Sequence, residues 1–274
     1  MLQTRVILPS MPLRPFVHHY WTMRADRSSF GMNIIPTGCM KWMFHRGNPF
    51  VINGVDDSSN VASICGQYNT GVLVRMNGYS DLIFVFFRPY ALKVILNMPG
   101  DAFMDDNIDM ESVGIPGMRE LKWRVLECDD NNVAIGYIEE FIMRRLAANP
   151  DFSQVRRMVA VCDEIDRHPG VGIDDLSNVA CLSERQFRRV FLENVGMTPK
   201  QMIRTKRFFF ATKAIQALDS GDFTDIVDKL GFTDHSHFNK EFKAFAGMSP
   251  TDYLNHIREL KRNDFFRGYR SYHE

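Results

Sequence analysis

The spacing of hydrophobic and polar residues changes character along the chain. In the first 115 residues, apolar runs of four to six residues alternate with turn-forming residues, and the clearest runs are Asn33–Pro36, Met40–His45, Val72–Met76 and Leu82–Phe87. Short runs bounded by Gly, Asn and Pro predict β-strands, and a series of them is typical of a sandwich or small barrel. The dipeptide Asn77-Gly78 between two runs predicts a hairpin turn.

From Gly117 onward the apolar residues recur at helical spacing. Asn132 is expected to cap a helix that extends to Ala148. The apolar stripe of this helix comprises Val133, Tyr137, Ile138, Phe141, Ile142 and Leu146. The sequence AANPD at 147–151 is typical of a linker, so we place a domain boundary at residue 150.

A segment of the helical region recurs 51 positions later. Residues 183–199, SERQFRRVFLENVGMTP, align with residues 234–250, DHSHFNKEFKAFAGMSP. Both copies keep two phenylalanines four positions apart, one basic position between them, and a closing Gly-Met-Thr/Ser-Pro. A copied segment of this length indicates one structural unit used twice.

Each copy is expected to be the second helix of a helix-turn-helix unit. Ile173 begins a short helix before the first copy, and residues 223–230 form the short helix before the second. Ser183 and Asp234 are suited to cap the copied helices. One long helix, 199–218, is expected to join the two units, with Phe208-Phe209-Phe210 packed in the core.

The positive charge of the chain is concentrated in this region. The 33 basic and 33 acidic residues cancel overall. Between residues 183 and 213, however, the only acidic residues are Glu184 and Glu193. The same stretch contains eight basic residues, namely Arg185, Arg188, Arg189, Lys200, Arg204, Lys206, Arg207 and Lys213. This cluster predicts either a nucleic-acid-binding surface or a solvated helix face on which i,i+4 ion pairs form.

Cysteine usage and hydropathy indicate a cytoplasmic protein. The five cysteines are scattered, odd in number and never in a CxxC pair, which argues against a disulfide framework and a zinc site. The N-terminal residues lack the pattern of a signal peptide. The longest apolar run, Leu82–Phe87, is far too short to span a membrane.

The run GFTDHSHFNKEFKAFAGMSPTDYL at 231–254, together with its fainter first copy, is similar to the signature of the AraC/XylS family of bacterial transcription regulators. The resemblance implies two helix-turn-helix units whose recognition helices enter successive major-groove segments. Cys181, Ser177 and Val227 depart from residues common in the family. In the N-terminal half, IPTGCMKWMFHRG and ICGQYNTG resemble a subset of these regulators, which implies a cupin-like domain.

The expected fold is therefore α+β with two domains. Residues 1–150 are expected to form a cupin-like β-sandwich or barrel with helices. Residues 151–260 are expected to form an all-α domain of two helix-turn-helix units joined by a long helix. Residues 261–274 are expected to be a C-terminal tail.

Double-stranded DNA is the expected partner of the helical domain. The resemblance assigns base reading to Arg185, Arg188 and Arg189 on the first recognition helix, and to His235, Ser236, His237, Asn239 and Lys240 on the second. Arginine can donate two hydrogen bonds to guanine, and asparagine can pair with adenine. Arg204, Lys206 and Arg207 on the linking helix are expected to bind phosphates. RNA polymerase is a further candidate partner, and an architectural DNA binder is the alternative function.

Three interpretations of the N-terminal half stay open. In the first, it binds a small-molecule effector in a pocket lined by Trp21, Trp42 and Phe44. In the second, it only dimerises, through the 132–148 helix. In the third, it is a metal oxygenase. The last needs a histidine cluster with a carboxylate. The only histidines there are His18, His19 and His45, and two adjacent residues on a strand point to opposite faces. No nucleophile or phosphate-loop motif is present, so we expect no enzyme, no cofactor and no metal.

Overall fold

The computed structural model describes residues 2–48, 50–52, 54–56, 61–103, 107–148, 152–218 and 220–262. It begins with eight strands, which are β1 (Leu2–Ile7), β2 (Val17–Ile34), β3 (Lys41–His45), β4 (Phe50–Ile52), β5 (Val55–Asp56), β6 (Ala62–Cys65), β7 (Val72–Phe87) and β8 (Asn107–Asp109). The expected domain boundary at residue 150 and most of the expected tail lie outside the described residues.

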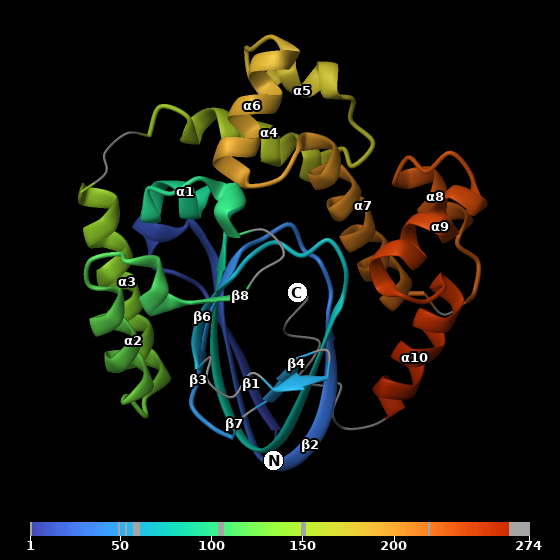
Figure 1. Cartoon of the computed structure of the whole chain (residues 1–274). Helices are drawn as coiled ribbons and strands as arrows, with labels where there is room; N and C mark the ends of the chain where they lie inside the picture. The colour runs from blue at the N-terminus through green and yellow to red at the C-terminus, as the bar shows by residue number, and fades with distance from the viewer. Residues whose placement is uncertain are drawn as a thin grey trace.

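The strands form one antiparallel sheet built around two long strands. Its order is β1-β2-β7-β3-β6-β8, with β4 paired to β5 and β7. Strands β2 and β7 pair from Val17 opposite Phe87 to Ile34 opposite Val72. The sheet curves strongly, and the helices lie around it (Figure 1). The expected β-rich N-terminal part and helical C-terminal part are confirmed.

The predicted hairpin at Asn77-Gly78 is wrong. These residues lie inside β7, opposite Ser29 and Ser28 of β2. The pairing register shifts between Ala25 and Ser28, and Gly78 has a φ of +92°. A glycine in this conformation bends a strand at a bulge without ending it. Two of the predicted runs are therefore halves of one strand.

Helices α1 (Ala91–Leu96), α2 (Met118–Leu126) and α3 (Asn131–Ala148) cover one side of the sheet (Figure 1). The ring of Phe141 on α3 lies 5.9 Å from that of Trp42 on β3. Ile138, Phe141, Ile142 and Leu146 are all buried. Most of the predicted apolar stripe therefore packs within the chain, so these four side chains are not available to a dimer surface, and dimerisation through this helix stays a prediction.

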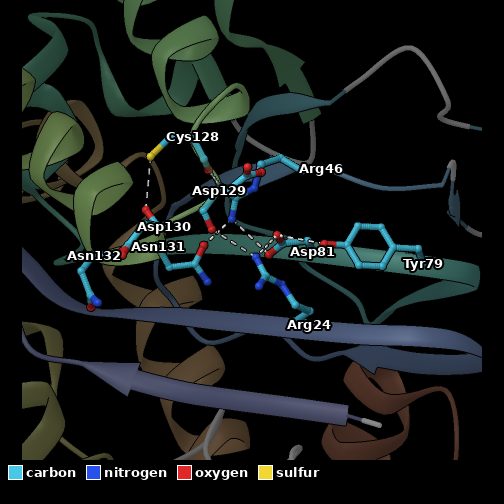
Figure 2. A network of polar contacts seen from close by, with 9 residues as sticks. All are labelled: Arg24, Arg46, Tyr79, Asp81, Cys128, Asp129, Asp130, Asn131 and Asn132. Atoms are coloured by element: carbon cyan, nitrogen blue, oxygen red, sulfur yellow. Dashed lines mark hydrogen bonds and ion pairs between the residues drawn. The ribbon is translucent and has the colours of Figure 1, made fainter.

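The start of α3 is held by a polar network around Asp81 (Figure 2). Asp81 on β7 is buried and pairs with Arg24 at 2.7 Å and with Arg46 at 3.1 Å. Arg46 also donates to the carbonyl of Cys128 and to the side chain of Asn131. The cap of α3 is Asp130, which accepts from the N–H of Asn132 at 2.7 Å, and not Asn132 as expected. The network fixes α3 against the sheet.

After α3, the described residues form seven helices: α4 (Val155–Arg167), α5 (Ile173–Val179), α6 (Glu184–Val195), α7 (Pro199–Gln216), α8 (Thr224–Lys229), α9 (His235–Ala246) and α10 (Pro250–Arg262). The pairs α5–α6 and α8–α9 are the two predicted helix-turn-helix units, and α7 is the predicted linking helix. Helices α4 to α7 lie across one end of the sheet, and α8 to α10 lie beside it (Figure 1).

The repeated phenylalanines anchor both units. Phe187 and Phe191 on α6 are fully buried with ring centroids 5.6 Å apart. Phe238 and Phe242 on α9 are equally buried and 5.7 Å apart. Phe208 of α7 lies 5.1 Å from Phe242. The i,i+4 spacing places both rings of each copy on one helix face.

We expect Phe242→Ala to lower the free energy of unfolding by about 3–5 kcal/mol, because removing a fully buried ring leaves a cavity. Val179→Ala at the end of α5, where 38% of the residue is exposed, is the control and should change stability by less than about 0.5 kcal/mol. Urea denaturation followed by circular dichroism measures both. Equal, small effects would show that Phe242 does not face the core.

Candidate nucleic-acid interface

Helix α6, which is expected to be the first recognition helix, separates an apolar face from a basic one. Ser183 is its N-cap, as predicted, and the backbone N–H of Ser183 donates to the side chain of Gln186 at 3.3 Å. Arg185, Arg188 and Arg189 are all exposed. Arg188 makes a 2.9 Å ion pair with Glu184. A surface pair of this kind contributes little, so the guanidinium can exchange it for another acceptor.

Helix α9, which is expected to be the second recognition helix, has the same construction. Asp234 is its N-cap, as predicted, and accepts from the N–H of His237 at 2.7 Å. His235, Ser236, Asn239 and Lys240 are exposed. His237 is only half-exposed, because its ring accepts from the N–H of Thr233 and contacts Phe232. Four of the five predicted positions are therefore fully available to a partner.

The two turns share one backbone pattern. Leu182 N–H donates to Ser177 at 3.0 Å, and Phe232 N–H donates to Val227 at 3.0 Å. The residue before each donor is left-handed: Gly231 has a φ of +71° and Cys181 a φ of +53°. A side chain in that region costs about 1–2 kcal/mol. Cys181 thus adopts the conformation of the glycine that is common in the family.

The three predicted phosphate-binding residues on α7 do not face outward together. Arg204 forms two 2.8 Å hydrogen bonds with Glu241 of α9. Burial by itself raises the pKa of Glu241, but the bonds from Arg204 lower it overall. Arg207 donates to the carbonyl of Pro169 at 3.3 Å and lies over the ring of Phe232. Both side chains hold the helix-turn-helix units together.

Lys206 departs most clearly from the expectation that the basic residues of α7 bind phosphates. Its side chain is buried, with 7% exposed, and its ammonium lies 2.8 Å from Asp166 of α4. It therefore points into the protein and cannot reach a DNA backbone in this conformation. Because α7 is packed on more than one side, a basic residue on it need not be a surface residue.

Lys206 faces a cavity of about 300 Å³ between the sheet and the helical domain. Its size lies at the lower end of small-molecule pockets. The sheet side contributes histidines, a ring and an arginine, and α4 and α7 contribute carboxylates, lysines and two further rings. The lining is His18, His19, Thr37, Cys39, Phe86, Arg88, Pro89, Tyr90, Cys162, Asp163, Asp166, Lys206, Phe209, Phe210 and Lys213.

The predicted effector residues do not line this cavity. Trp21, Trp42 and Phe44 are almost completely buried in the cores on the two faces of the sheet. The hollow inside the curved sheet, next to Met43 and Phe84, has a volume of only about 30 Å³. That is room for about one water molecule. The larger cavity, between the domains, was missed because it joins residues from distant parts of the sequence.

His18 and His19 both line the cavity, contrary to the expectation for adjacent residues. The register of β2 against β7 shifts between Val17 and His19, so alternation is broken there. The two Nδ1 atoms lie 2.7 Å apart. Burial, with the cations Arg88 and Lys206, lowers the pKa of His18 to about 4. Burial, with His18, lowers the pKa of His19 to about 3. The cavity therefore disfavours additional positive charge.

The described part of the chain holds neither a metal-binding cluster nor a membrane-spanning helix. No group of three or more histidine, cysteine, aspartate or glutamate side chains is placed to hold a metal ion among these residues. Within the same ranges, no helix is both long and apolar enough to cross a membrane.

Two segments match known domain families. Residues 176–256 match a family described as a helix-turn-helix domain, and residues 5–109 match a family described as a domain of unknown function, DUF6597. The first contains the turns, both recognition helices and α7. The second spans β1 to β8.

Similar proteins include transcription regulators. The chain is 33% identical over 103 residues to the probable transcriptional regulator LumQ of Photobacterium leiognathi, covering 37% of this chain and 41% of that protein. It is 25% identical over 135 residues to the HTH-type regulator YidL of Escherichia coli strain K12, covering 47% and 45%. The chain thus spans less than half of either relative. Over 93% of this chain and 98% of the other, it superimposes on ToxT of Vibrio cholerae O395 with a TM-score of 0.45 and 13% identity.

The depressed histidine pKa values predict acid sensitivity. Below about pH 6.5 the unfolded chain takes up protons, whereas His19 with a pKa of about 3 stays neutral in the folded protein. The free energy of unfolding is therefore not reduced by this histidine at pH 7, and it falls as the pH is lowered. His18 and His45, each with a pKa of about 4, add to this loss.

Urea midpoints at pH 7 and pH 5 measure the effect. We expect the wild-type protein to lose more stability on acidification than His19→Gln. His256→Gln, which replaces an exposed histidine on α10, should behave as wild type. An identical loss in His19→Gln would show that His19 is protonated in the folded state.

Proposed function

We propose, from the premise that the chain carries an AraC-type helix-turn-helix domain, that it is a transcription regulator which reads DNA with both α6 and α9. The domain family and the similar proteins are regulators rather than enzymes. In this proposal the two helices enter successive major-groove segments of one duplex. The protein acts in the cytoplasm, with RNA polymerase as the partner of an activating form.

One observation carries the proposal, namely that the two recognition helices have the same construction. Each is capped at its N-terminus, buries two phenylalanines on one face and exposes polar and basic residues on the other. Base reading requires such an exposed N-terminal face. The proposed base-reading residues are Arg185, Arg188 and Arg189 on α6, and His235, Ser236, Asn239 and Lys240 on α9, with His237 as a cap residue that contributes less.

Selection of bound sequences from random duplex DNA by the full chain tests this. Two short enriched blocks about one helical turn apart, with affinity that falls steeply as salt is added, support two reading helices. Weak, salt-sensitive binding with no enriched block favours the alternative of an architectural DNA-binding protein. No DNA binding at all refutes both.

The cavity between the domains favours control by a small ligand. Three cations, Arg88, Lys206 and Lys213, face it together with two carboxylates, and its phenyl and phenol rings are those of Phe86, Tyr90, Phe209 and Phe210. Both cavity histidines are neutral at pH 7, so the three cations outnumber the two carboxylates. The lining therefore carries a net positive charge beside its aromatic rings. An organic anion with an apolar body fits this lining.

Lysine and phenylalanine residues of α7 line the cavity, and the same helix joins the two helix-turn-helix units. A ligand that displaces Phe209 or Phe210 therefore acts on the element that connects α6 and α9. Ligand binding and DNA binding are then coupled through one rigid element, as linkage between two sites requires.

Arg188→Ala is expected to relax sequence preference. Loss of one bidentate contact to guanine costs about 1–3 kcal/mol on the specific site, and much less on scrambled DNA. Lys200→Ala removes the same charge from an exposed position at the start of α7 and is the matched control, expected to affect both DNAs alike. Fluorescence anisotropy titrations on the two duplexes measure the ratio. Equal losses for Arg188→Ala on both would rule out base reading by this residue.

Lys213→Ala is expected to weaken anion binding in the cavity. The probe is anilinonaphthalene sulfonate, compared with phenylnaphthylamine, which lacks the sulfonate. We expect about a tenfold loss for the charged probe, because a hydrogen bond to a charged group is removed. The uncharged probe and the Lys200→Ala control should be unaffected. Unchanged binding of both probes to Lys213→Ala would argue against an anion site there.

A further inference from the structure

One loop of the N-terminal domain contacts the C-terminal ends of both recognition helices. This β6–β7 loop comprises residues 66–71, within the sequence ICGQYNTG. The side-chain Nε2 of Gln67 donates to the carbonyl of Val195 on α6 at 2.7 Å. The backbone N–H of Gly71 donates to the carbonyl of Phe245 on α9 at 2.9 Å. Two carbonyls that lie 50 positions apart in the sequence thus accept from donors only four positions apart.

These bonds satisfy backbone carbonyls at the C-terminal ends of α6 and α9. The last four carbonyls of a helix have no partner within it. On α6 the N–H of Gly196 satisfies Leu192, and on α9 the N–H of Gly247 satisfies Lys243. The carbonyls of Val195 and Phe245 receive their donors from the other domain. Gln67 is 98% buried, so its bond is shielded from water and costly to leave unmade.

A close backbone contact fixes α6 independently. Gly100 begins the 3-10 helix η2 (Gly100–Phe103) of the N-terminal domain. A Cβ added at Gly100 lies 2.5 Å from the backbone nitrogen of Gly196, directly after α6. Lys93 of α1 also pairs with Glu193 at 3.2 Å. The end of α6 is therefore held from the side of the N-terminal domain at more than one point.

We propose that the β6–β7 loop braces the two recognition helices against each other and so sets the interval between the two DNA blocks that the protein accepts. Gln67 is then a positioning residue that acts through α6 without touching DNA. The inference rests on the proposed function, because it assumes that α6 and α9 both read bases.

The loop can set the preferred interval because, once one helix is bound to its block, the other helix has an effective concentration at the second block that depends on how the two helices are linked. Helix α7 joins the two units, and its Arg204 and Arg207 contact α9, the turn of the second unit and Pro169 before α5. The β6–β7 loop adds a connection at a different place, the C-terminal ends of α6 and α9, and so further restricts the relative tilt of these two helices. A rigid link gives high avidity only for partners whose spacing matches it, whereas a loose link spreads the avidity over many spacings.

Binding of the full chain to a set of duplexes tests this. The set holds the selected two-block sequence, the same blocks with the interval changed stepwise by single base pairs, and each block alone. Gln67→Met keeps the length of the side chain and removes the donor. Gly100→Ala introduces the backbone clash with Gly196 and does not depend on Gln67.

Two controls accompany these variants. Thr70→Ala alters an exposed residue of the same loop, and Gly136→Ala adds a Cβ on α3 where no atom lies within 4 Å. The circular dichroism spectrum of every variant is compared with that of wild type. Using two unrelated variants keeps the test open if one of them fails to fold.

We expect the wild-type protein and both controls to bind one interval much more tightly than the others. In Gln67→Met and Gly100→Ala this preference should fall by about fivefold or more, the lower end of typical coupling between sites. Affinity for each single block, and the base preference within it, should stay unchanged. A merely destabilised protein would instead lose affinity for every duplex and keep its interval preference.

Interval preferences in both variants that equal those of wild type would overturn the inference and leave the proposed function standing. A wild-type protein that selects no two-block sequence would overturn the proposed function, and the inference with it.

Discussion

Burial of two phenylalanine rings under each of the helices α6 and α9 is the interaction on which the helical domain depends. Phe187 with Phe191, and Phe238 with Phe242, lie at i,i+4 spacing and are fully enclosed. Because a helix is rigid, fixing one face determines which residues appear on the other. The exposure of the arginines on α6 and of the polar residues on α9 follows from that anchoring. The caps Ser183 and Asp234 then decide where each exposed face begins.

The N-terminal domain contacts the helical domain through the two segments that resemble known regulators. Gly38, in the first segment, has a φ of +73°, and a Cβ there lies 2.9 Å from the sulfur of Met202 on α7. Gln67, in the second segment, bonds to α6. Each segment therefore includes a loop that contacts the helical domain. Their position gives the N-terminal domain direct contact with the linking helix and with both recognition helices, which is what control of DNA binding by a ligand requires.

Charge was the least reliable guide to the site. The eight basic residues between 183 and 213 form one cluster in sequence, but they divide into two groups in space. Arg185, Arg188 and Arg189 are exposed, whereas Arg204 binds Glu241 and Lys206 binds Asp166. The distinction depends on which helices pack against α7, and helical periodicity cannot identify those neighbours. The same limitation explains Trp42, whose neighbour Phe141 on α3 makes it a core residue.

The sequence by itself determined the helix-turn-helix units, their caps and the facing of their recognition helices, because these depend on local spacing within about a dozen residues. Only the tertiary structure decided the rest. It united Val72 to Phe87 in one strand, because the bulge at Gly78 keeps β7 paired to β2. It placed His18 beside His19 through a shift in register. It formed the cavity and the β6–β7 loop contacts, which join residues more than 100 positions apart and arise only when the domains pack together.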